Sequence, residues 1–282
     1  MVSLRGLKSC NQLETLNCSN NNLKTLAGLE RCESLRLIHC SFNKLVSLTG
    51  LKVCLQLDTL GLCRNNLTSL KGLEACPNLR TLDCSFNDLV TIDGVNNCPL
   101  LQEIDLTKNY LESLANLGQC SLLVKLKCWQ NEIATLDALA ELEQLIELDC
   151  SHNKLHTLRG IEGCPKLVEL TCCANEIDTI SAIEACTELK VLHCGSNRIT
   201  TLRSLEYCPH LKTLNCRNNR LTSIDGTQGC HDLLQLDCSK NYVKGLNEIL
   251  HMPLLQRVHY FKLGLEKQAP AVQQILDRIG KS

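Results

Sequence analysis

The sequence predicts an extended solenoid in which short strands and tight turns alternate in stacked coils. The first observation is a regular period, because leucine recurs every 22 residues from Leu13 to Leu255 without insertion or deletion. The second is the apolar spacing that opens each period, L-x-x-L-x-C, whose last two apolar residues alternate as in a half-buried strand. The third is length, since a 22-residue coil cannot bury its own apolar face and must share a core with its neighbours.

The composition favours a small, repeated core over a globular one. Hydrophobic residues make up 44% of the 282 residues, but aromatic residues only 3%, whereas aromatic side chains usually supply much of a core's buried area. The net charge of −1 gives no reason to expect a polyanion or an anionic membrane as partner. No apolar run approaches the roughly 20 residues of a membrane-spanning helix. The first ten residues also lack the apolar segment of a secretory signal. We therefore expect a cytoplasmic or nuclear protein that binds neither nucleic acid nor membrane.

One repeat reads L-x-x-L-x-C-x-x-N-x-L-x-T/S-L-x-G-L-x-x-C-x-x, and its positions are numbered here from the first leucine. Residues 1–12 form a half repeat, residues 13–254 hold eleven complete repeats, and a degenerate repeat begins at residue 255. A strand is expected at the start of each repeat, followed by a bend at the asparagine. The remaining residues are too few for a long helix but suffice for a 3₁₀ turn.

Position 9 is asparagine in every complete repeat. At the bend, the backbone turns both donors and acceptors toward the interior, and a carboxamide can satisfy both. The sequence therefore predicts a structural asparagine ladder rather than a ligand site. Its members are Asn21, Asn43, Asn65, Asn87, Asn109, Asn131, Asn153, Asn175, Asn197, Asn219 and Asn241.

The 21 cysteines fall mostly into two columns, with ten at position 20 and nine at position 6. Leucine replaces cysteine at Leu62 and Leu106, so the cysteines are interpreted as small, buried apolar residues with free thiols. No C-x-x-C spacing supports a zinc finger or a redox dithiol. Two adjacent columns of thiols indicate a reducing compartment.

Two cysteines, Cys63 and Cys173, lie outside the columns at position 7. Each is expected between a histidine and an aspartate of the neighbouring strands: Cys63 with His39 and Asp83, and Cys173 with His193 and Asp149. Such a cluster would suit a metal ion or a thiol nucleophile. Diagonal neighbours on a sheet are roughly 7–8 Å apart, and an open sheet face excludes little water. Coincidence is the favoured interpretation, and no metal site or cofactor is predicted.

The repeat resembles the leucine-rich repeat family, specifically its short 22-residue class. The stretches LDCSFNDLVTIDGV (82–95) and LDCSHNKLHTLRGI (148–161) carry the resemblance, which extends from about Leu4 to Leu263. It implies an α/β horseshoe with a parallel sheet on the concave face and short 3₁₀ turns on the convex face. The expected domains are a repeat array at 1–263 and a carboxy-terminal cap at 264–282.

The two ends of the array are expected to differ. Residues 269–282 read as an amphipathic capping helix that opens at Pro270. Its apolar residues, Val272, Ile275, Leu276 and Ile279, can cover the last coil. No comparable element precedes the first repeat, and an exposed strand edge invites pairing. We therefore expect possible self-association or a partner contact at the amino-terminal edge.

Positions 3, 5 and 7 should point outward from the concave sheet, where a protein partner can bind. Trp129 is the only tryptophan and stands where most repeats have Ser, Thr or Gly, and tryptophan is enriched at binding hot spots. Carboxylates and lysines occupy positions 3 and 5 of its own repeat and of the neighbouring repeats. Two phenylalanines occupy position 8 of earlier repeats. The predicted partner-binding residues are Glu103, Asp105, Lys127, Trp129, Glu147, Asp149, Phe42 and Phe86.

These observations favour a non-catalytic interaction module or scaffold that binds a protein on its concave face. Within the family, the repeat length and number are similar to those of the nuclear regulatory subunit of protein phosphatase 1 and to internalin-like repeats. The resemblance to the former implies a phosphatase regulatory role as one alternative. The others are an architectural subunit of a large assembly and, less favoured, a Cys/His metal or thiol site.

Overall fold

The computed structural model of the protein describes residues 1–260 and 269–279. It divides into two compact units. The N-terminal unit comprises Met1–Ile133 and Glu141–Leu145, and the C-terminal unit comprises Ala134–Ala140 and the described part of Ile146–Ser282. The predicted boundary between array and cap, at residues 263 and 264, lies outside the described residues.

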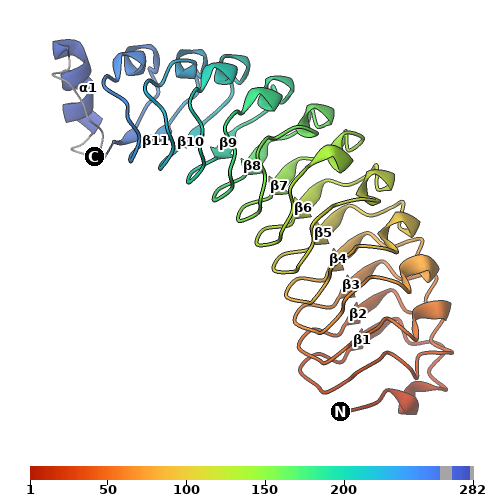
Figure 1. Ribbon diagram of the computed structural model, residues 1–282. Coiled ribbons are helices and arrows are strands. Elements are labelled where there is room, and N and C mark those ends of the chain that lie inside the picture. Colours follow the sequence, from red (N-terminus) through yellow and green to blue (C-terminus); the bar gives the residue numbers. More distant parts are fainter. Residues whose placement is uncertain (261–268, 280–282) are drawn as a thin grey trace. The chain divides into compact units, whose positions relative to one another are not determined.

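Each unit contains a ladder of three-residue parallel strands that follow one another in chain order (Figure 1). The strands of the N-terminal unit are β1 (Thr15–Asn17), β2 (Leu37–His39), β3 (Thr59–Gly61), β4 (Thr81–Asp83), β5 (Glu103–Asp105) and β6 (Lys125–Lys127). Those of the C-terminal unit are β7 (Glu147–Asp149), β8 (Glu169–Thr171), β9 (Val191–His193), β10 (Thr213–Asn215), β11 (Gln235–Asp237) and β12 (Arg257–His259). The predicted strand at the start of each repeat is thereby confirmed.

The repeat sets the register of these strands. Within each unit, a strand residue pairs with the residue 22 positions later, as Leu82 does with Ile104 in the N-terminal unit and Leu170 with Leu192 in the C-terminal unit. The central residue of nearly every strand is buried and the flanking residues are more exposed, as the period-2 geometry of a strand requires. Positions 3 and 5 of successive repeats therefore form two straight rows of outward-facing side chains.

Short 3₁₀ turns occupy the side of the coils opposite to the strands (Figure 1). In the N-terminal unit they are η1 (Arg5–Leu7), η2 (Leu51–Val53), η3 (Leu73–Ala75), η4 (Val95–Asn97) and η5 (Leu117–Gln119). In the C-terminal unit they are η6 (Asp137–Leu139), η7 (Ile161–Gly163), η8 (Ser181–Ala185), η9 (Arg203–Tyr207), η10 (Thr227–Gly229) and η11 (Asn247–His251). The prediction that the return path holds turns and no long helix is confirmed.

The asparagines of position 9 bond one coil to the next. In the N-terminal unit, Asn87 donates from Nδ2 to the carbonyl oxygens of Leu62 (3.0 Å) and Cys84 (3.0 Å). Its Oδ1 accepts the backbone N–H of Leu67 at 3.0 Å. Asn219 of the C-terminal unit makes the same set of bonds with its own neighbours. A carboxamide is needed because both a donor and an acceptor are used.

Glycine is required where two coils approach at the turn. Gly50 has φ +121°, and a Cβ there would lie 2.2 Å from the carbonyl oxygen of Leu26. In the C-terminal unit, Gly160 has φ +109°, and a Cβ would lie 2.1 Å from the carbonyl oxygen of Leu136. Any side chain at these positions would force the coils apart.

The cysteine columns do more than fill space. All but Cys10, Cys63 and Cys173 are buried. The thiol of Cys120 donates to the carbonyl of Val95 at 3.6 Å, and that of Cys164 donates to the carbonyl of Leu139 at 3.5 Å. Position 20 therefore adds a weak S–H donor to a carbonyl in the 3₁₀ turn of the preceding coil, which the sequence did not indicate.

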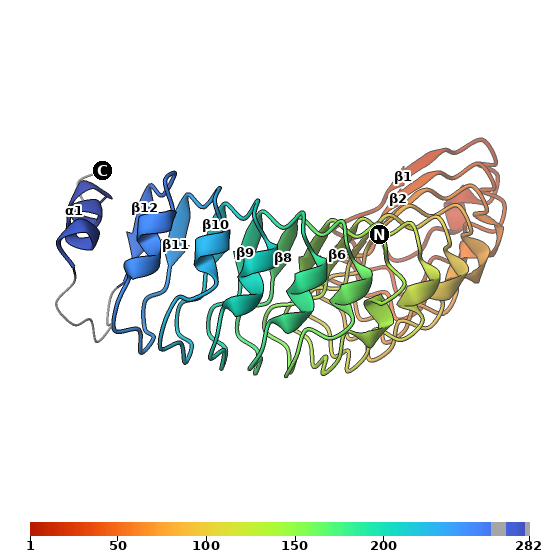
Figure 2. The same ribbon diagram turned by 90° about the horizontal axis from the view of Figure 1, so that it is seen from above.

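The carboxy-terminal helix α1 (Pro270–Ile279) covers the end of the C-terminal unit. It packs against η11 and β12 and lies beside them in the view from above (Figure 2). Val272, Leu276 and Ile279 are buried and Ile275 is half-buried. The predicted capping helix and its start at Pro270 agree with the structure.

Candidate functional site

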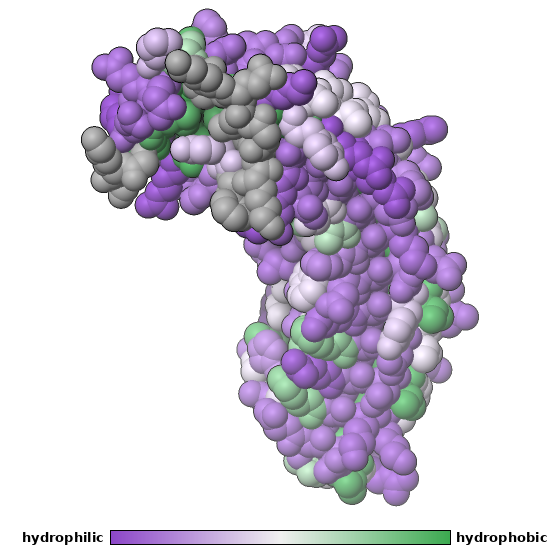
Figure 3. All heavy atoms as spheres, turned by 60° about the vertical axis from the view of Figure 1, so that its left-hand side comes forward, coloured by the Kyte–Doolittle hydropathy of each residue, from purple (hydrophilic) through white to green (hydrophobic). Residues whose placement is uncertain are grey.

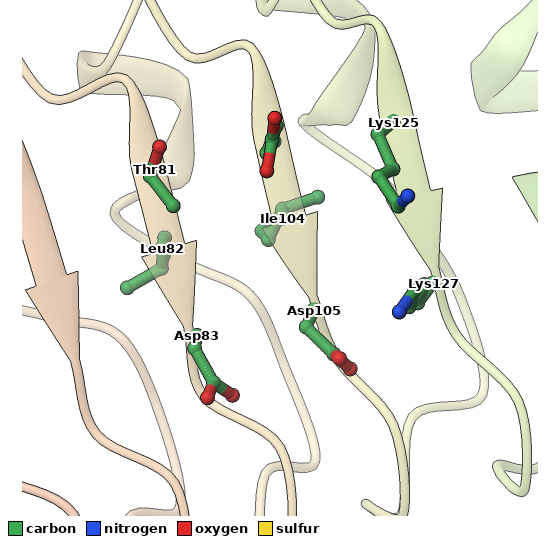
Figure 4. Close-up of a pocket in the computed structure, with 8 residues that line it drawn as sticks. Thr81, Leu82, Asp83, Ile104, Asp105, Lys125 and Lys127 are labelled. Atoms are coloured by element: carbon green, nitrogen blue, oxygen red, sulfur yellow. The ribbon is translucent and has the colours of Figure 1, made fainter. Parts of the chain in front are cut away.

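Charged side chains form two rows on the outward face of β4, β5 and β6. The register aligns Asp83, Asp105 and Lys127 in one row. It aligns Glu103 with Lys125 in the other. A hollow of about 200 Å³ lies among these side chains (Figure 4). We call these five residues the charged rows. They give this face both signs of charge within three adjacent strands.

The carboxylates of Asp83 and Asp105 are held in place by the bend that follows each strand. Asp83 accepts hydrogen bonds from the backbone N–H of Ser85 (3.0 Å) and from its hydroxyl (2.6 Å). Asp105 accepts the backbone N–H of Thr107 at 2.9 Å. One oxygen of each carboxylate is therefore committed to the bend, which fixes the direction of the other.

A further set of side chains, which we call the stacked column, lies beside the charged rows just after the ends of the strands. It consists of Phe42, Arg64, Phe86, Lys108 and Trp129. The guanidinium of Arg64 lies 5.4 Å from the ring of Phe42 and 4.4 Å from that of Phe86. The ammonium of Lys108 lies 4.8 Å from Phe86 and 5.4 Å from Trp129. Aromatic rings and cations thus alternate across five consecutive repeats at distances suited to cation–π attraction.

The backbone of the stacked column is left-handed at position 8. The φ values are +57° at Phe42, +56° at Arg64, +55° at Phe86 and +53° at Lys108. This region is unfavourable for bulky side chains and is best tolerated by Gly and Asn. The phenylalanines, arginine and lysine therefore occupy positions that the backbone alone would not select them for.

The structure brings together six of the eight predicted partner-binding residues and adds others. Glu103, Asp105 and Lys127 lie in the charged rows, and Phe86 and Trp129 lie in the stacked column beside them. Phe42 lies further along the same column and is 50% exposed. Glu147 and Asp149 belong to β7 of the C-terminal unit, where they pair with Glu169 and Thr171.

Sequence reasoning missed Asp83 and Lys108 as members of this surface. It treated Asp83 only as a neighbour of Cys63, and it did not include Arg64 among the partner-binding residues. The available signal was the alternation of aromatic and basic residues at position 8, which ends beside the tryptophan at position 7 of the next repeat.

The surroundings of the two isolated cysteines do not favour a reactive thiolate. Burial raises the pKa of the Cys63 thiol, and the same cause raises the pKa of Cys173. A thiol with a raised pKa has little of the nucleophilic thiolate. Within residues 1–260 and 269–279, no group of three or more His, Cys, Asp and Glu side chains is placed to hold a metal ion.

Elsewhere in the described residues, an apolar patch or a membrane-spanning helix would be the feature to compare with this surface. On the face shown in Figure 3, hydrophobic residues are scattered among hydrophilic ones. Among the described residues, no helix combines the length and the apolar character that crossing a bilayer demands. The charged rows and the stacked column are therefore the candidate functional site.

Comparison with known structures places the chain beside several repeat proteins. Internalin InlF of Listeria monocytogenes is 22% identical, with a TM-score of 0.86, and the match covers 92% of this chain and 77% of that one. The functional domain of InlJ from the same organism, whose structure includes a cysteine ladder, is 27% identical with a TM-score of 0.80, covering 89% and 54%. The plant peptide hormone receptor RGFR1, solved in complex with RGF2, is 21% identical with a TM-score of 0.77, covering 93% and 49%.

The sequence comparisons address the family. A search of curated protein sequences finds no match. The family model for leucine-rich repeats in two copies matches residues 56–97, 77–119, 143–185, 187–226 and 209–251. These segments span more than half of the sequence, and they coincide with the repeats seen in the structure. The predicted fold class is confirmed, and the chain belongs to the leucine-rich repeat family.

Proposed function

We propose that the protein is a non-catalytic interaction module whose N-terminal unit binds a partner protein on the outward face of β4–β6. The observation that carries the proposal is the juxtaposition of the charged rows with Trp129. Tryptophan is a frequent hot-spot residue, and fixed charges of both signs at its side can select a partner and set its orientation.

The rigidity of the surface supports this function. Every residue of the charged rows belongs to a strand that is bonded in register to its neighbours within the unit. Little conformational entropy is lost when such a surface binds, which leaves more of the contact energy for affinity. We expect a partner patch of mixed charge, with basic residues opposite Asp83, Glu103 and Asp105.

The proposal extends to Glu147 and Asp149 on β7 of the C-terminal unit. These residues lie at positions 3 and 5 and are half-buried, on either side of the buried Leu148. Asp149 accepts the backbone N–H of Ser151 at 3.1 Å, so one of its oxygens is fixed as in Asp105. A basic segment of the partner is the expected contact.

The test is affinity capture from native cell lysate, read by mass spectrometry. The wild-type protein is compared with Trp129→Ala and Asp105→Lys, and Leu55→Ala serves as a control because Leu55 is 53% exposed outside the candidate site. A prey retained by wild type and Leu55→Ala but lost by both site variants supports the proposal. Identical preys with all four proteins contradict it.

The same capture separates the alternatives. A phosphatase catalytic subunit among the dependent preys would assign the regulatory role that the family resemblance suggests. A large complex that protects η2–η5 from hydrogen exchange, and that still forms with the Trp129→Ala variant, would favour an architectural subunit. We also propose that the cysteines of the two columns are free thiols and that the protein works in a reducing compartment. Thiol titration of protein purified under argon checks the state of the thiols.

A further inference from the structure

The two cations of the stacked column carry unused hydrogen-bonding capacity. In the described part of the chain, neither Arg64 nor Lys108 forms an ion pair, and both are held by aromatic rings instead. Stacking engages the face of a guanidinium and leaves its N–H edge free to donate. An ammonium likewise keeps donors that a ring cannot satisfy. Both side chains can therefore accept an anionic group from outside the chain.

The spacing of the two cations is set by the repeat. They lie two strands apart, which corresponds to about 9.6 Å at the usual strand separation. The distances of 4.4 Å and 4.8 Å to the same ring of Phe86 limit the separation of the two charged groups to at most about 9 Å. A ligand that engages both cations in these positions therefore suits two anionic groups about this far apart.

One common protein conformation offers this distance directly. A polyproline II helix rises about 3.1 Å per residue with three residues per turn, so side chains three residues apart share a face about 9.3 Å apart. A β-strand offers about 6.6–6.8 Å between side chains on one face, which is too short for the pair. Proline-rich segments in this conformation also dock on aromatic side chains, and Phe42, which is 50% exposed, offers one at the end of the column.

A hollow of about 320 Å³ lies at the Lys108 end of the column. Lys108, Tyr110, Gln130 and the acidic Glu132 line it, together with ladder asparagines whose side chains are bonded to the backbone. Tyr110 is 58% exposed. The hollow gives an anchoring side chain of a ligand a place beside the second cation.

We propose that the stacked column binds an acidic protein segment in the polyproline II conformation, with one carboxylate on Arg64 and a second, three residues away, on Lys108. The proposal rests on the proposed function, that the N-terminal unit binds a protein, and it names the chemistry of the segment bound. Asp83 and Asp105 carry negative charge near this ligand, and Lys127, which pairs with Asp105 in register, offsets part of it.

The experiment titrates the full-length protein against a fluorescein-labelled peptide in which glutamates stand at every third position between prolines. Two control peptides have glutamine in place of glutamate, or the same composition with adjacent glutamates. The protein variants are Arg64→Gln, Lys108→Gln and, as a matched control, Lys52→Gln, since Lys52 is an exposed cation in η2. Circular dichroism and thermal unfolding verify that each variant is folded.

The expected result is that the regularly spaced peptide binds at least about tenfold more tightly than either control peptide, since charge-assisted hydrogen bonds are the strong ones. Arg64→Gln and Lys108→Gln should each weaken binding about tenfold, Lys52→Gln less than twofold, and added salt should weaken it further. Phe86→Leu, which removes the ring between the cations but keeps an apolar side chain, should weaken binding without lowering Tm by more than a few degrees.

Equal binding of all three peptides, or no binding at about 1 mM peptide, would overturn the proposal. Binding of a labelled oligouridylate that depends on Arg64, with none of the peptide, would also overturn it in favour of a nucleic-acid site. These outcomes leave the proposed function intact if capture of a partner still depends on Trp129 and Asp105. If the peptide still binds but capture of a partner does not depend on Trp129 and Asp105, only the proposed function is contradicted.

Discussion

The two units share one backbone at position 8 but carry different side chains there. In the N-terminal unit, the left-handed residues include Phe42, Arg64, Phe86 and Lys108, whereas in the C-terminal unit they are His152, Ala174, Ser196, Asn218 and Lys240. All have φ between +53° and +58°. The conformation is therefore a property of the repeat, and the C-terminal unit forms it mostly with small or polar side chains.

This difference separates what the fold needs from what it permits. Position 9 is asparagine in both units, and its hydrogen bonds are the same in both. Position 8 tolerates alanine and serine in one unit, so the rings and cations of the other are not required to make the bend. A residue that the backbone does not require, in a conformation that disfavours it, is available for selection on binding.

The largest predicted effect tests the shared part of this comparison. Asn87→Ala and Asn219→Ala should each lower the free energy of unfolding by about 2–4 kcal/mol, because several buried backbone groups lose their partners. Asn96→Ala, at an exposed position of η4, should change it little. Hydrogen exchange of the Leu67 and Ile199 amides, which donate to these asparagines, gives a local measurement. A large effect in one unit only would show that the ladder is not equivalent in both.

The next effect concerns the thiols of the two units. Burial raises the pKa of Cys76 and of Cys186 to about 12, so thiolate is scarce at neutral pH. Iodoacetamide should modify Cys10, Cys63 and Cys173 of the folded protein well before these column cysteines, as peptide mapping would reveal. Early modification of Cys76 or Cys186 would indicate that the core opens locally in that unit.

A smaller effect tests the dispensable part of the comparison. Phe42→Asn should leave the protein as stable or raise Tm by a degree or two, because asparagine tolerates the left-handed conformation better than phenylalanine. The loss of one exposed cation–π contact, worth about 0.5–1 kcal/mol, opposes this gain. The corresponding change in the C-terminal unit, Ala174→Asn, removes no ring or hydrogen-bonding side chain and should raise Tm slightly more. A marked drop for Phe42→Asn would mean that the ring is structural.

The smallest effect lies at the end of the C-terminal unit and depends on pH. Burial, and next a hydrogen bond with Asp225, raise the pKa of Glu248 above its ordinary value of 4.5, and its buried Oε2 has no hydrogen-bond partner within the described residues. The folded chain therefore holds this proton more tightly than the unfolded chain, and stability is lost as pH rises through the folded pKa. Glu248→Gln should raise Tm slightly at pH 7 and leave it unchanged near pH 4. An equal shift at both values would exclude titration as the cause.

Much of the fold was predictable because one constraint repeats. A 22-residue coil that buries leucine at fixed positions has few ways to stack, so the strands and the turns follow from that spacing. The capping helix from Pro270 follows from a separate amphipathic pattern in residues 269–282. The asparagine column was likewise readable, since only a carboxamide satisfies donors and acceptors together. The candidate site was less predictable, because Glu103 and Trp129 stand out by type whereas Lys108 is an ordinary surface residue until its neighbours are known.

The sequence by itself determined the period, the buried columns and the chemical identity of each outward position, because these depend on spacing along one chain. The tertiary structure decided which of those positions face one another. Only stacking places Arg64 between two rings contributed by the preceding and following repeats, and only the register aligns Asp105 with Lys127. Side-chain contacts between residues 22 positions apart depend on rotamers and distances, which spacing along the chain does not specify.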